Sequence, residues 1–139
     1  MAFRSVGTVL KVGSDVSAVA VANITEIGGI SLSADSIDVT SLDSDGGYKE
    51  FIPGFKDAGE VSLSGFFNPA TGKGQKELYD LFESGETSAF TIEFPPKTKA
   101  KWAFNGVVTG FETSASLEDP ISFSGTIKVS GKPTLTITE

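Results

Sequence analysis

Carboxylates are the side chains of this sequence most able to do chemistry, because it contains neither histidine nor cysteine. Histidine is the commonest general base and zinc ligand, and cysteine supplies the thiolates of metal and redox sites. Serines and threonines are plentiful, but they lack a histidine to activate them, and no G-x-S-x-G motif is present. The available chemistry is therefore that of Asp and Glu.

A possible calcium loop begins at Asp43-Ser44-Asp45-Gly46, where acidic oxygens alternate. An EF-hand loop needs a bidentate Glu at its last position. Counted from either possible start, that position falls on Gly54 or Ile52. A solvated turn is the alternative interpretation, and the sequence favours it, so no metal is expected.

Two carboxylate pairs, Asp35 with Asp38 and Glu118 with Asp119, are of the kind a glycosidase uses. Nearly every acidic protein contains such pairs. The sequence also has neither a G-x-x-x-x-G-K-[ST] nor a G-x-G-x-x-G phosphate-binding loop. We therefore predict a protein without enzymatic activity and without a cofactor.

The charge is unevenly distributed. The net charge is −7, which disfavours a non-specific nucleic-acid binder, because phosphate contacts need a basic surface. Between Asp35 and Glu60 there are seven acidic residues and only two lysines.

Lys97, Lys99 and Lys101 would share one face of an extended strand. They are interpreted in three ways: as a weak nucleic-acid stripe, as a solvated edge that discourages strand pairing, or as the positive half of a contact with the acidic loop of a neighbouring copy, where Asp43 and Asp45 lie.

The first residues, MAFRSVGTVLKVG, lack the basic and then apolar pattern of a secretory signal. The most apolar run, from Val16 to Ala22, is too short to span a bilayer. We expect no membrane association, and a chain kept in a cytoplasm or released by a route other than secretion.

The elements that position these residues are expected to be mostly strands, because Val, Thr, Ile, Ser and Phe recur throughout. Strands are expected over residues 5–12, 17–27, 36–40, 60–67, 89–94, 99–112, 121–130 and 134–138. Asn105-Gly106 is a hairpin signal, but the apolar phase continues across it, which favours one long bent strand. A single helix is expected at about 73–84, where Leu78, Leu81 and Phe82 form a stripe flanked by Tyr79, with Thr71 as N-cap and Gly85 at the C-terminal end.

The most unusual stretch is residues 41–59, a 19-residue connection between the strand of Ile37 and Val39 and the strand of Val61 and Leu63. A hairpin needs only two to five residues. The segment nevertheless carries four large apolar side chains, Tyr48, Phe51, Ile52 and Phe55. Ordering its backbone costs more than the burial of four side chains returns. We therefore expect it to become ordered against a second subunit and to serve in assembly.

The chain resembles the tail tube proteins (major tail proteins) of long-tailed, non-contractile bacteriophages over essentially its whole length. The resemblance rests on GTVLKVG, on IDVTSLDS-x-GGYKEFIPGFKDAGEVSLSGFF, on the helix KELYDLFESG and on ISFSGTIKVSGKPTLT. It implies a mainly β fold, a β-sandwich or partly closed barrel with one flanking helix, as a single domain over residues 1–139. It also implies that this is the tube domain alone, without the C-terminal immunoglobulin-like domain of some members.

The resemblance implies a structural virion protein that assembles into hexameric rings stacked into a hollow tube. The tube would hold a tape-measure protein during assembly, contact terminator and tail-tip proteins, and conduct DNA without binding it specifically. The chain would be in the host cytoplasm during assembly and afterwards in the virion tail. The residues of the assembly loop expected at the subunit interface are Tyr48, Phe51, Ile52, Phe55, Lys56 and Asp57. The alternative is a monomeric β-sandwich that binds a ligand or protein through the same loop.

Overall fold

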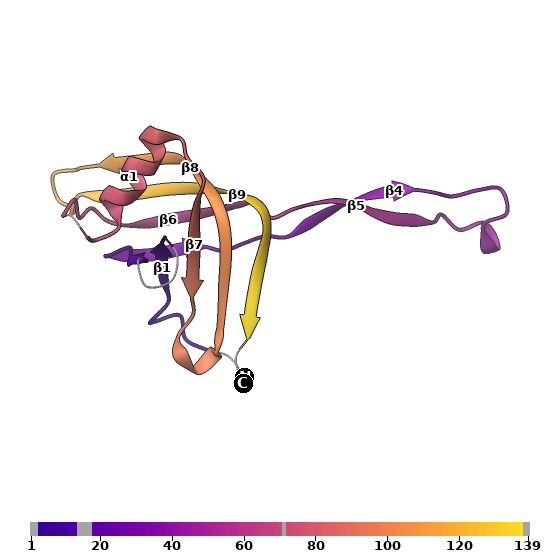
Figure 1. Cartoon of the computed structure of the whole chain (residues 1–139), viewed down its shortest axis with the longest axis horizontal. Coiled ribbons are helices and arrows are strands. Elements are labelled where there is room, and N and C mark those ends of the chain that lie inside the picture. The colour runs from indigo at the N-terminus through magenta and orange to yellow at the C-terminus, as the bar shows by residue number, and fades with distance from the viewer. Residues whose placement is uncertain (1–2, 14–17, 71, 138–139) are drawn as a thin grey trace.

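The computed structural model describes residues 3–13, 18–70 and 72–137. Two parts are evident in Figure 1, a body built on one curled sheet and a long arm that projects from it. The strands are β1 (Val9–Val12), β2 (Val19–Ala20), β3 (Ile24–Gly28), β4 (Ser33–Asp38), β5 (Phe51–Asp57), β6 (Glu60–Phe66), β7 (Ser88–Glu93), β8 (Ala100–Ser114) and β9 (Ser122–Ile137). The helix is α1 (Gln75–Ser84), and η2 (Asp45–Gly47) and η3 (Pro96–Thr98) are short 3-10 turns.

The body is one seven-stranded antiparallel sheet in the order β2-β1-β7-β8-β9-β6-β3. Its burial alternates as the sequence predicts for half-buried strands, most clearly in β6, where Val61, Leu63 and Gly65 are buried and their neighbours are exposed. The buried rows of β1, β6, β7, β8 and β9 meet on one face and form a single hydrophobic core with Leu78 of α1. The predicted mainly β fold with one flanking helix is confirmed. Of the two predicted architectures, sandwich and partly closed barrel, the curled sheet forms the partly closed barrel.

The two longest strands, β8 and β9, form the spine of the sheet. The structure bears out one long strand through Asn105-Gly106, since both residues pair with β9, with register shifts on either side. The expected break at 131–133 is wrong. Strand β9 continues to Ile137, and a register shift opposite β8 absorbs the extra residues between Ser130 and Thr134.

The expected strand over 17–27 is instead two strands on opposite edges of the sheet. Val21 donates from its backbone to Leu10 of β1 (2.8 Å), while the carbonyl of Asn23 accepts from Phe66 of β6 (2.9 Å). The chain therefore crosses from one edge to the other within three residues, with Asn23 at φ 61° in the turn. This crossing partly closes the barrel.

Helix α1 lies on the core face of the sheet. It begins at Gln75 and ends at Ser84, and Gly85 has the predicted left-handed conformation (φ 72°) and donates its N–H to Leu81. Leu78 is buried, Leu81 is half-buried, and Tyr79 packs edge-on against Phe111 of β8. The expected N-cap, Thr71, lies outside the described residues.

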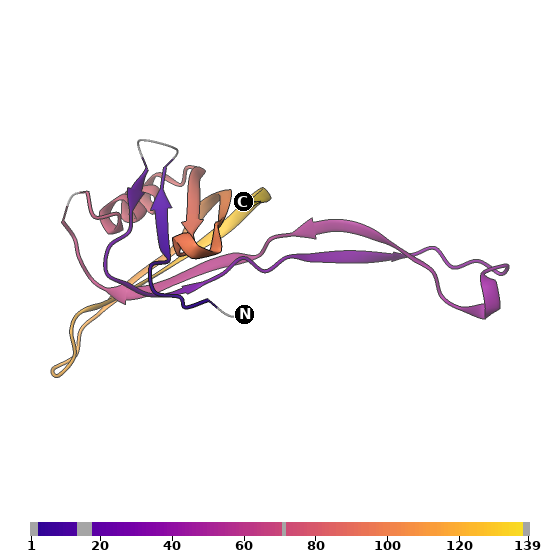
Figure 2. The same ribbon diagram turned by 90° about the horizontal axis from the view of Figure 1, so that it is seen from below.

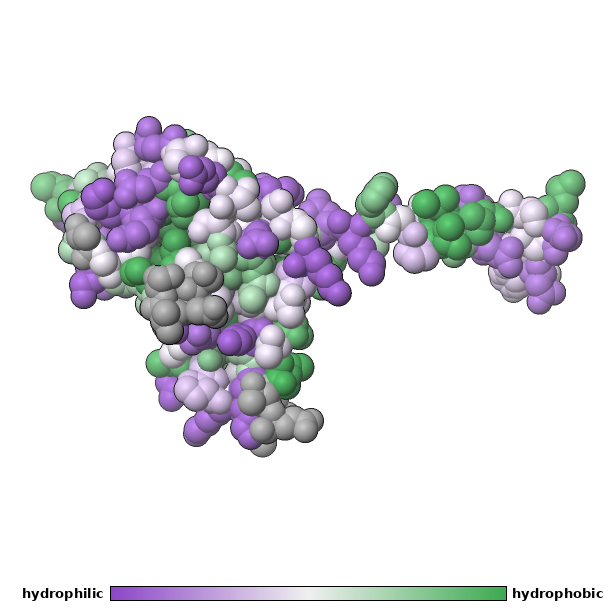
Figure 3. Space-filling view, viewed as in Figure 1, coloured by the Kyte–Doolittle hydropathy of each residue, from purple (hydrophilic) through white to green (hydrophobic). Residues whose placement is uncertain are grey.

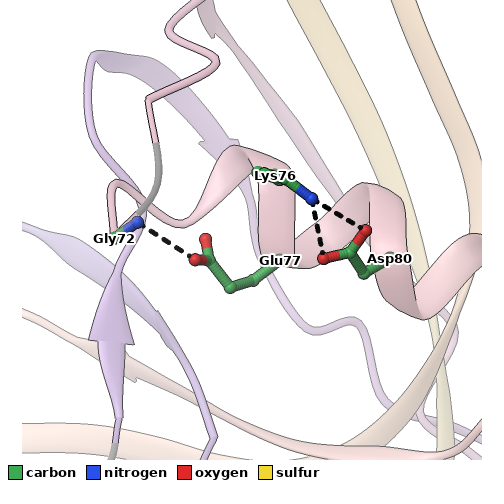
Figure 4. A network of polar contacts seen from close by, with 4 residues as sticks. All are labelled: Gly72, Lys76, Glu77 and Asp80. Atoms are coloured by element: carbon green, nitrogen blue, oxygen red, sulfur yellow. Dashed lines mark hydrogen bonds and ion pairs between the residues drawn. The ribbon is translucent and has the colours of Figure 1, made fainter.

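Polar contacts hold the first turns of α1 (Figure 4). The Glu77 carboxylate accepts from the Gly72 backbone N–H at 3.2 Å, and Lys76 pairs with Asp80 at 3.3 Å along the helix. An acidic side chain in the first turn also complements the partial positive charge of the helix N-terminus.

Gln75 is a buried polar residue that the sequence pattern does not reveal. Its side chain is 0% exposed. The amide nitrogen donates to the carbonyls of Ala22 (2.9 Å) and Phe66 (2.8 Å), and the amide oxygen accepts from the N–H of Asn68 (2.8 Å). Gln75 thus joins the β2–β3 crossing to the end of β6 and fastens the partial closure of the barrel.

The arm corrects the expectation of a 19-residue connection over 41–59. Its second half is strand β5, which pairs antiparallel with β4 in a separate two-stranded sheet. Figure 2, turned by 90° from Figure 1, shows the same projecting ribbon, so the arm stands clear of the body in both views. The loop proper is only the tip between Asp38 and Phe51. No described helix has the length and apolar character needed to cross a bilayer.

Candidate assembly surface

The arm is a two-stranded ribbon with no core of its own. Ile37 lies opposite Ile52, and Asp38 lies opposite Phe51, in a regular antiparallel register that shifts between Ala34 and Ser36. Every residue of β4 is exposed, and in β5 only Gly54 is half-buried. The sequence predicted a half-buried strand around Ile37; within one subunit this strand has no covered face.

The predicted interface residues all lie on this arm, and all of them are exposed. Phe55 is 93% exposed and Tyr48 is 77% exposed, and Phe51 and Ile52 are also open to solvent. The neighbouring apolar side chains Leu32, Ile37, Val39 and Leu42 are exposed as well, and sequence reasoning did not include them. Figure 3 shows hydrophobic surface along the arm and at its tip.

So many large apolar side chains exposed on one element are unusual in a monomer and are typical of an interaction surface. The other two predicted interface residues are charged. They are Lys56 and Asp57, at the end of β5 nearest the body.

Side-chain hydrogen bonds order the tip of the arm. The Thr40 hydroxyl accepts from the Glu50 N–H at 2.7 Å, and Val39 donates from its backbone to the Glu50 carbonyl at 2.9 Å. The Ser44 hydroxyl donates to the Glu50 carboxylate at 2.8 Å and accepts from the Ser41 N–H at 2.9 Å. The tip is therefore a folded turn built from short polar side chains.

Three of the carboxylates considered for chemistry, Asp38, Asp43 and Asp119, accept hydrogen bonds within turns. Asp43 accepts from the Ser41 hydroxyl, which lowers the pKa of the Asp43 carboxyl, and Asp38 accepts from the Thr40 N–H at 2.9 Å. Asp119 accepts from Ser116 at 2.9 Å in the turn between β8 and β9. Among the described residues, no group of three or more acidic side chains is arranged to hold a metal ion.

The root of the arm is fixed to the body at β5 and β6. Only Ala58 and Gly59 separate the two strands, and Ala58 is buried. Asp57 accepts from the Gly59 N–H at 2.8 Å and pairs with Lys128 of β9 at 3.6 Å. The hydrogen bond from Gly59, followed by the charge of Lys128, lowers the pKa of the Asp57 carboxyl.

Gly59 itself has φ +73° and lies against the Ser31 carbonyl, so a side chain at this position would be strained.

The predicted basic stripe does not exist as a strand face. Lys97 lies in η3, and Lys99 has φ 55°, which ends that turn in the left-handed conformation. Only Lys101 lies in a strand, where it is opposite Glu93 of β7. The prolines before Lys97 start a turn and not a strand, so the period of two fails. The three lysines are exposed around one corner of the body.

An open groove lies at the same corner of the body. Its walls are the N-terminal segment 3–8, β3 with the residues after it, and the end of β7 with η3. The apolar residues lining it are Phe3, Val6, Ile24, Ile27, Ile30, Ile92, Phe94, Pro95 and Trp102. Four of these residues, Ile24, Ile27, Ile30 and Trp102, are partly buried against the hydrophobic core. Sequence reasoning did not identify the groove, because it is formed by segments distant in the chain.

A curled sheet with a projecting arm whose large apolar side chains are exposed is typical of a subunit that associates with another protein surface. The lambda phage tail tube protein family matches residues 2–136, and the chain belongs to this family.

Several solved structures share this fold. A chain of the virion of a native gene transfer agent has 22% identity and a TM-score of 0.78, covering 97% of this chain and 99% of its own. A chain of the tail of an empty gene transfer agent particle, refined with C6 symmetry, has 23% identity and a TM-score of 0.79 with the same coverage. The SPP1 tail tube has 14% identity and a TM-score of 0.67, covering 94% of this chain and 78% of its own. No curated protein matches the chain significantly.

Proposed function

We propose that residues 1–139 form a single tail tube domain, copies of which close into hexameric rings and stack into a hollow tube. Membership of the tail tube family carries this proposal. It is supported by the same fold in a gene transfer agent tail refined with C6 symmetry. A ring of identical subunits needs a head-to-tail interface whose rotation closes, and stacking adds a contact along the axis.

The arm supplies the contact that a tube needs. Tyr48, Phe51, Ile52 and Phe55 leave water only if another subunit covers them, since the arm is distant from its own body (Figure 1). Lys56 and Asp57 lie beside these residues at the rim of the interface. Asp43 and Asp45 at the tip, with Lys97, Lys99 and Lys101 at the corner of the body, provide charges of opposite sign for contacts between rings.

The tube is a conduit for DNA and a virion component of the tail, assembled in the host cytoplasm. Its partners besides itself are a tape-measure protein inside the tube and the terminator and tip proteins at its ends. Similar folds occur in a sheath/tube terminator complex and in a tube-terminating cap, which supports contacts of this kind. This role requires no catalysis, metal or cofactor, and we propose none.

Electron microscopy of concentrated protein tests the proposal. We expect rings with sixfold symmetry in top view and hollow tubes in side view. The alternative, a monomeric module that binds a ligand or protein through residues 41–59, predicts monomers at every concentration. A sample that stays monomeric, even with tail-tip complex present to nucleate assembly, contradicts the tube role.

A further inference from the structure

The open groove beside the N-terminal segment is lined by many apolar side chains, so it is suited to bind an apolar segment of another chain. Trp102 and Phe94 form part of one wall, and Ile27 and Ile30 form part of the other. Ile92 lies between Leu10 and Trp102 in the paired strands and belongs to the buried core, so the groove borders directly on the hydrophobic core. An apolar groove left open in this way is a place where a further apolar segment gains by binding.

Positively charged residues lie in and beside this groove. Arg4 and Thr98 line it, and Thr98 is flanked by Lys97 and Lys99. The ion pairs found among the described residues involve Lys11, Lys76 and Lys128, so these cations have no described acidic partner. Glu26 is the one acidic residue among those lining the groove.

The arm has the complementary character. From Ser33 to Asp57 it carries six acidic residues and two lysines, together with its exposed aromatic and aliphatic side chains. The arm combines apolar and acidic residues, and the groove combines apolar and basic residues. The two surfaces are therefore complementary in charge as well as in hydrophobicity. An unpaired sheet edge adds backbone groups, because β3, which forms one wall of the groove, is the last strand of its sheet.

The arm does not occupy the groove of its own subunit. It projects away from the body in two perpendicular views, and its apolar side chains are exposed throughout (Figures 1 and 2).

We propose that the groove lined by Val6, Phe94 and Trp102 receives the arm of a second copy of this chain. This inference rests on the proposed tube function and specifies which surface of the neighbour the arm contacts. Phe51, Ile52 or Phe55 enters the apolar part of the groove, and the acidic residues of the arm face Arg4 and the η3 lysines.

Cross-linking between engineered cysteines tests this pairing directly, because the natural chain has no cysteine. One variant carries Phe55→Cys on the arm, and a second carries Val6→Cys at the groove, where Val6 is 77% exposed. The two are mixed, assembled and treated with a short bis-maleimide. The matched control uses Leu117→Cys in place of Val6→Cys. Leu117 lies in the β8–β9 turn and is 101% exposed.

We expect a cross-linked dimer with Val6→Cys in assembled samples and little with Leu117→Cys. Tubes in which Phe55→Cys links to Leu117→Cys, or to neither position, overturn the groove assignment and leave the tube function intact. Failure of the parent chain, with Phe55 and Val6 in place, to form tubes removes the proposed function together with this inference.

Charge reversal gives an independent measurement on the full chain. Arg4→Glu with Lys97→Glu should raise the protein concentration needed for assembly by about tenfold, because like charges then face each other. Adding Asp43→Lys and Asp45→Lys to the same chain should restore assembly. Lys73→Glu is the control, since Lys73 is exposed just before α1 and does not line the groove. Equal effects of the two charge reversals, or no rescue, contradict the pairing.

Discussion

Gln75 shows how one buried side chain holds the closure of the body. It satisfies two carbonyls and one N–H that belong to three separate backbone positions around the β2–β3 crossing. A buried amide with all of its partners in place stabilises one arrangement of these segments over others.

Replacing Gln75 should therefore destabilise the isolated subunit. In Gln75→Ala the three backbone groups lose their partner, and each unsatisfied group costs about 1–3 kcal/mol. We expect a lower midpoint of urea unfolding measured by circular dichroism. Lys76→Ala, at the exposed neighbouring position, is the control. A midpoint for Gln75→Ala equal to that of Lys76→Ala would show that the closure does not depend on this amide.

Asp57 makes the root of the arm sensitive to acid. The pKa of its carboxyl is lowered by the Gly59 hydrogen bond and by Lys128, so the ionised form is favoured in the folded state. Its contribution to stability is therefore present above the unfolded pKa of about 3.8 and is lost as the pH falls through the lower folded pKa. In NMR spectra, the Gly59 amide shift should titrate with a midpoint below 3.8, and Asp57→Asn should abolish that titration. A midpoint at or above 3.8 would contradict the proposed contact.

At the scale of elements, the arm is separable from the body. Its residues contribute nothing to the hydrophobic core, and β3 and β6 already pair antiparallel up to its root. Replacing residues 33–57 by a short Gly-Ser turn should leave a folded monomer with an unfolding midpoint close to that of the parent, while tube formation is lost. Circular dichroism and electron microscopy measure the two effects. Tubes of normal appearance from this variant would exclude the arm from assembly.

A single apolar side chain of the arm should have a smaller effect in the same direction. Phe55→Ser removes a phenyl group whose burial by a neighbour is worth about 2 kcal/mol. We therefore expect assembly at a concentration roughly tenfold or more higher, seen by sedimentation, with unchanged thermal unfolding of the monomer. Leu117→Ser, equally exposed but distant from the arm, is the matched control. If both variants assemble like the parent, Phe55 is not an anchor.

Sequence patterns predicted the strands and the helix that bury one face, because burial of one face makes apolar residues recur at a regular spacing. Strand β6 and helix α1 each present one apolar row to the core, so their positions followed from the sequence. Strand β5 has no covered face in one subunit, so its residues do not alternate between apolar and polar, and the sequence predicts a loop over residues 51–57. Lys99 broke the expected lysine stripe because its backbone conformation depends on the turn that begins at Pro96.

Of the candidate site, the sequence predicted the exposed aromatic residues but not the groove. Tyr48 and Phe55 stand out locally as large apolar residues in a polar segment. The groove joins Val6, Ile27 and Trp102, which are far apart in sequence and come together only when the sheet curls. Buried Gln75 was missed for a similar reason, since its partners lie in two other segments.

At the scale of the whole molecule, stability should be distributed unevenly between body and arm. The β8–β9 pair is long and buried on one face, whereas the arm has exposed backbone hydrogen bonds and no packing. In the monomer, hydrogen exchange should be fast in β4 and β5 and slow in β8 and β9. In assembled tubes the arm amides should become protected, while those of β9 change little. Arm amides that exchange equally fast in both states would contradict burial of the arm by a neighbour.

The slender connection between arm and body has a mechanical consequence. Two short chain segments join the arm to the body. They are residues 29–32, between β3 and β4, and Ala58-Gly59, between β5 and β6. If successive rings are held together by such ribbons, bending the tail flexes the ribbon roots and leaves the curled sheets undistorted. In such a tube the bore would keep its diameter while the tail bends, because the compliant and the rigid parts of each subunit would be different stretches of one chain.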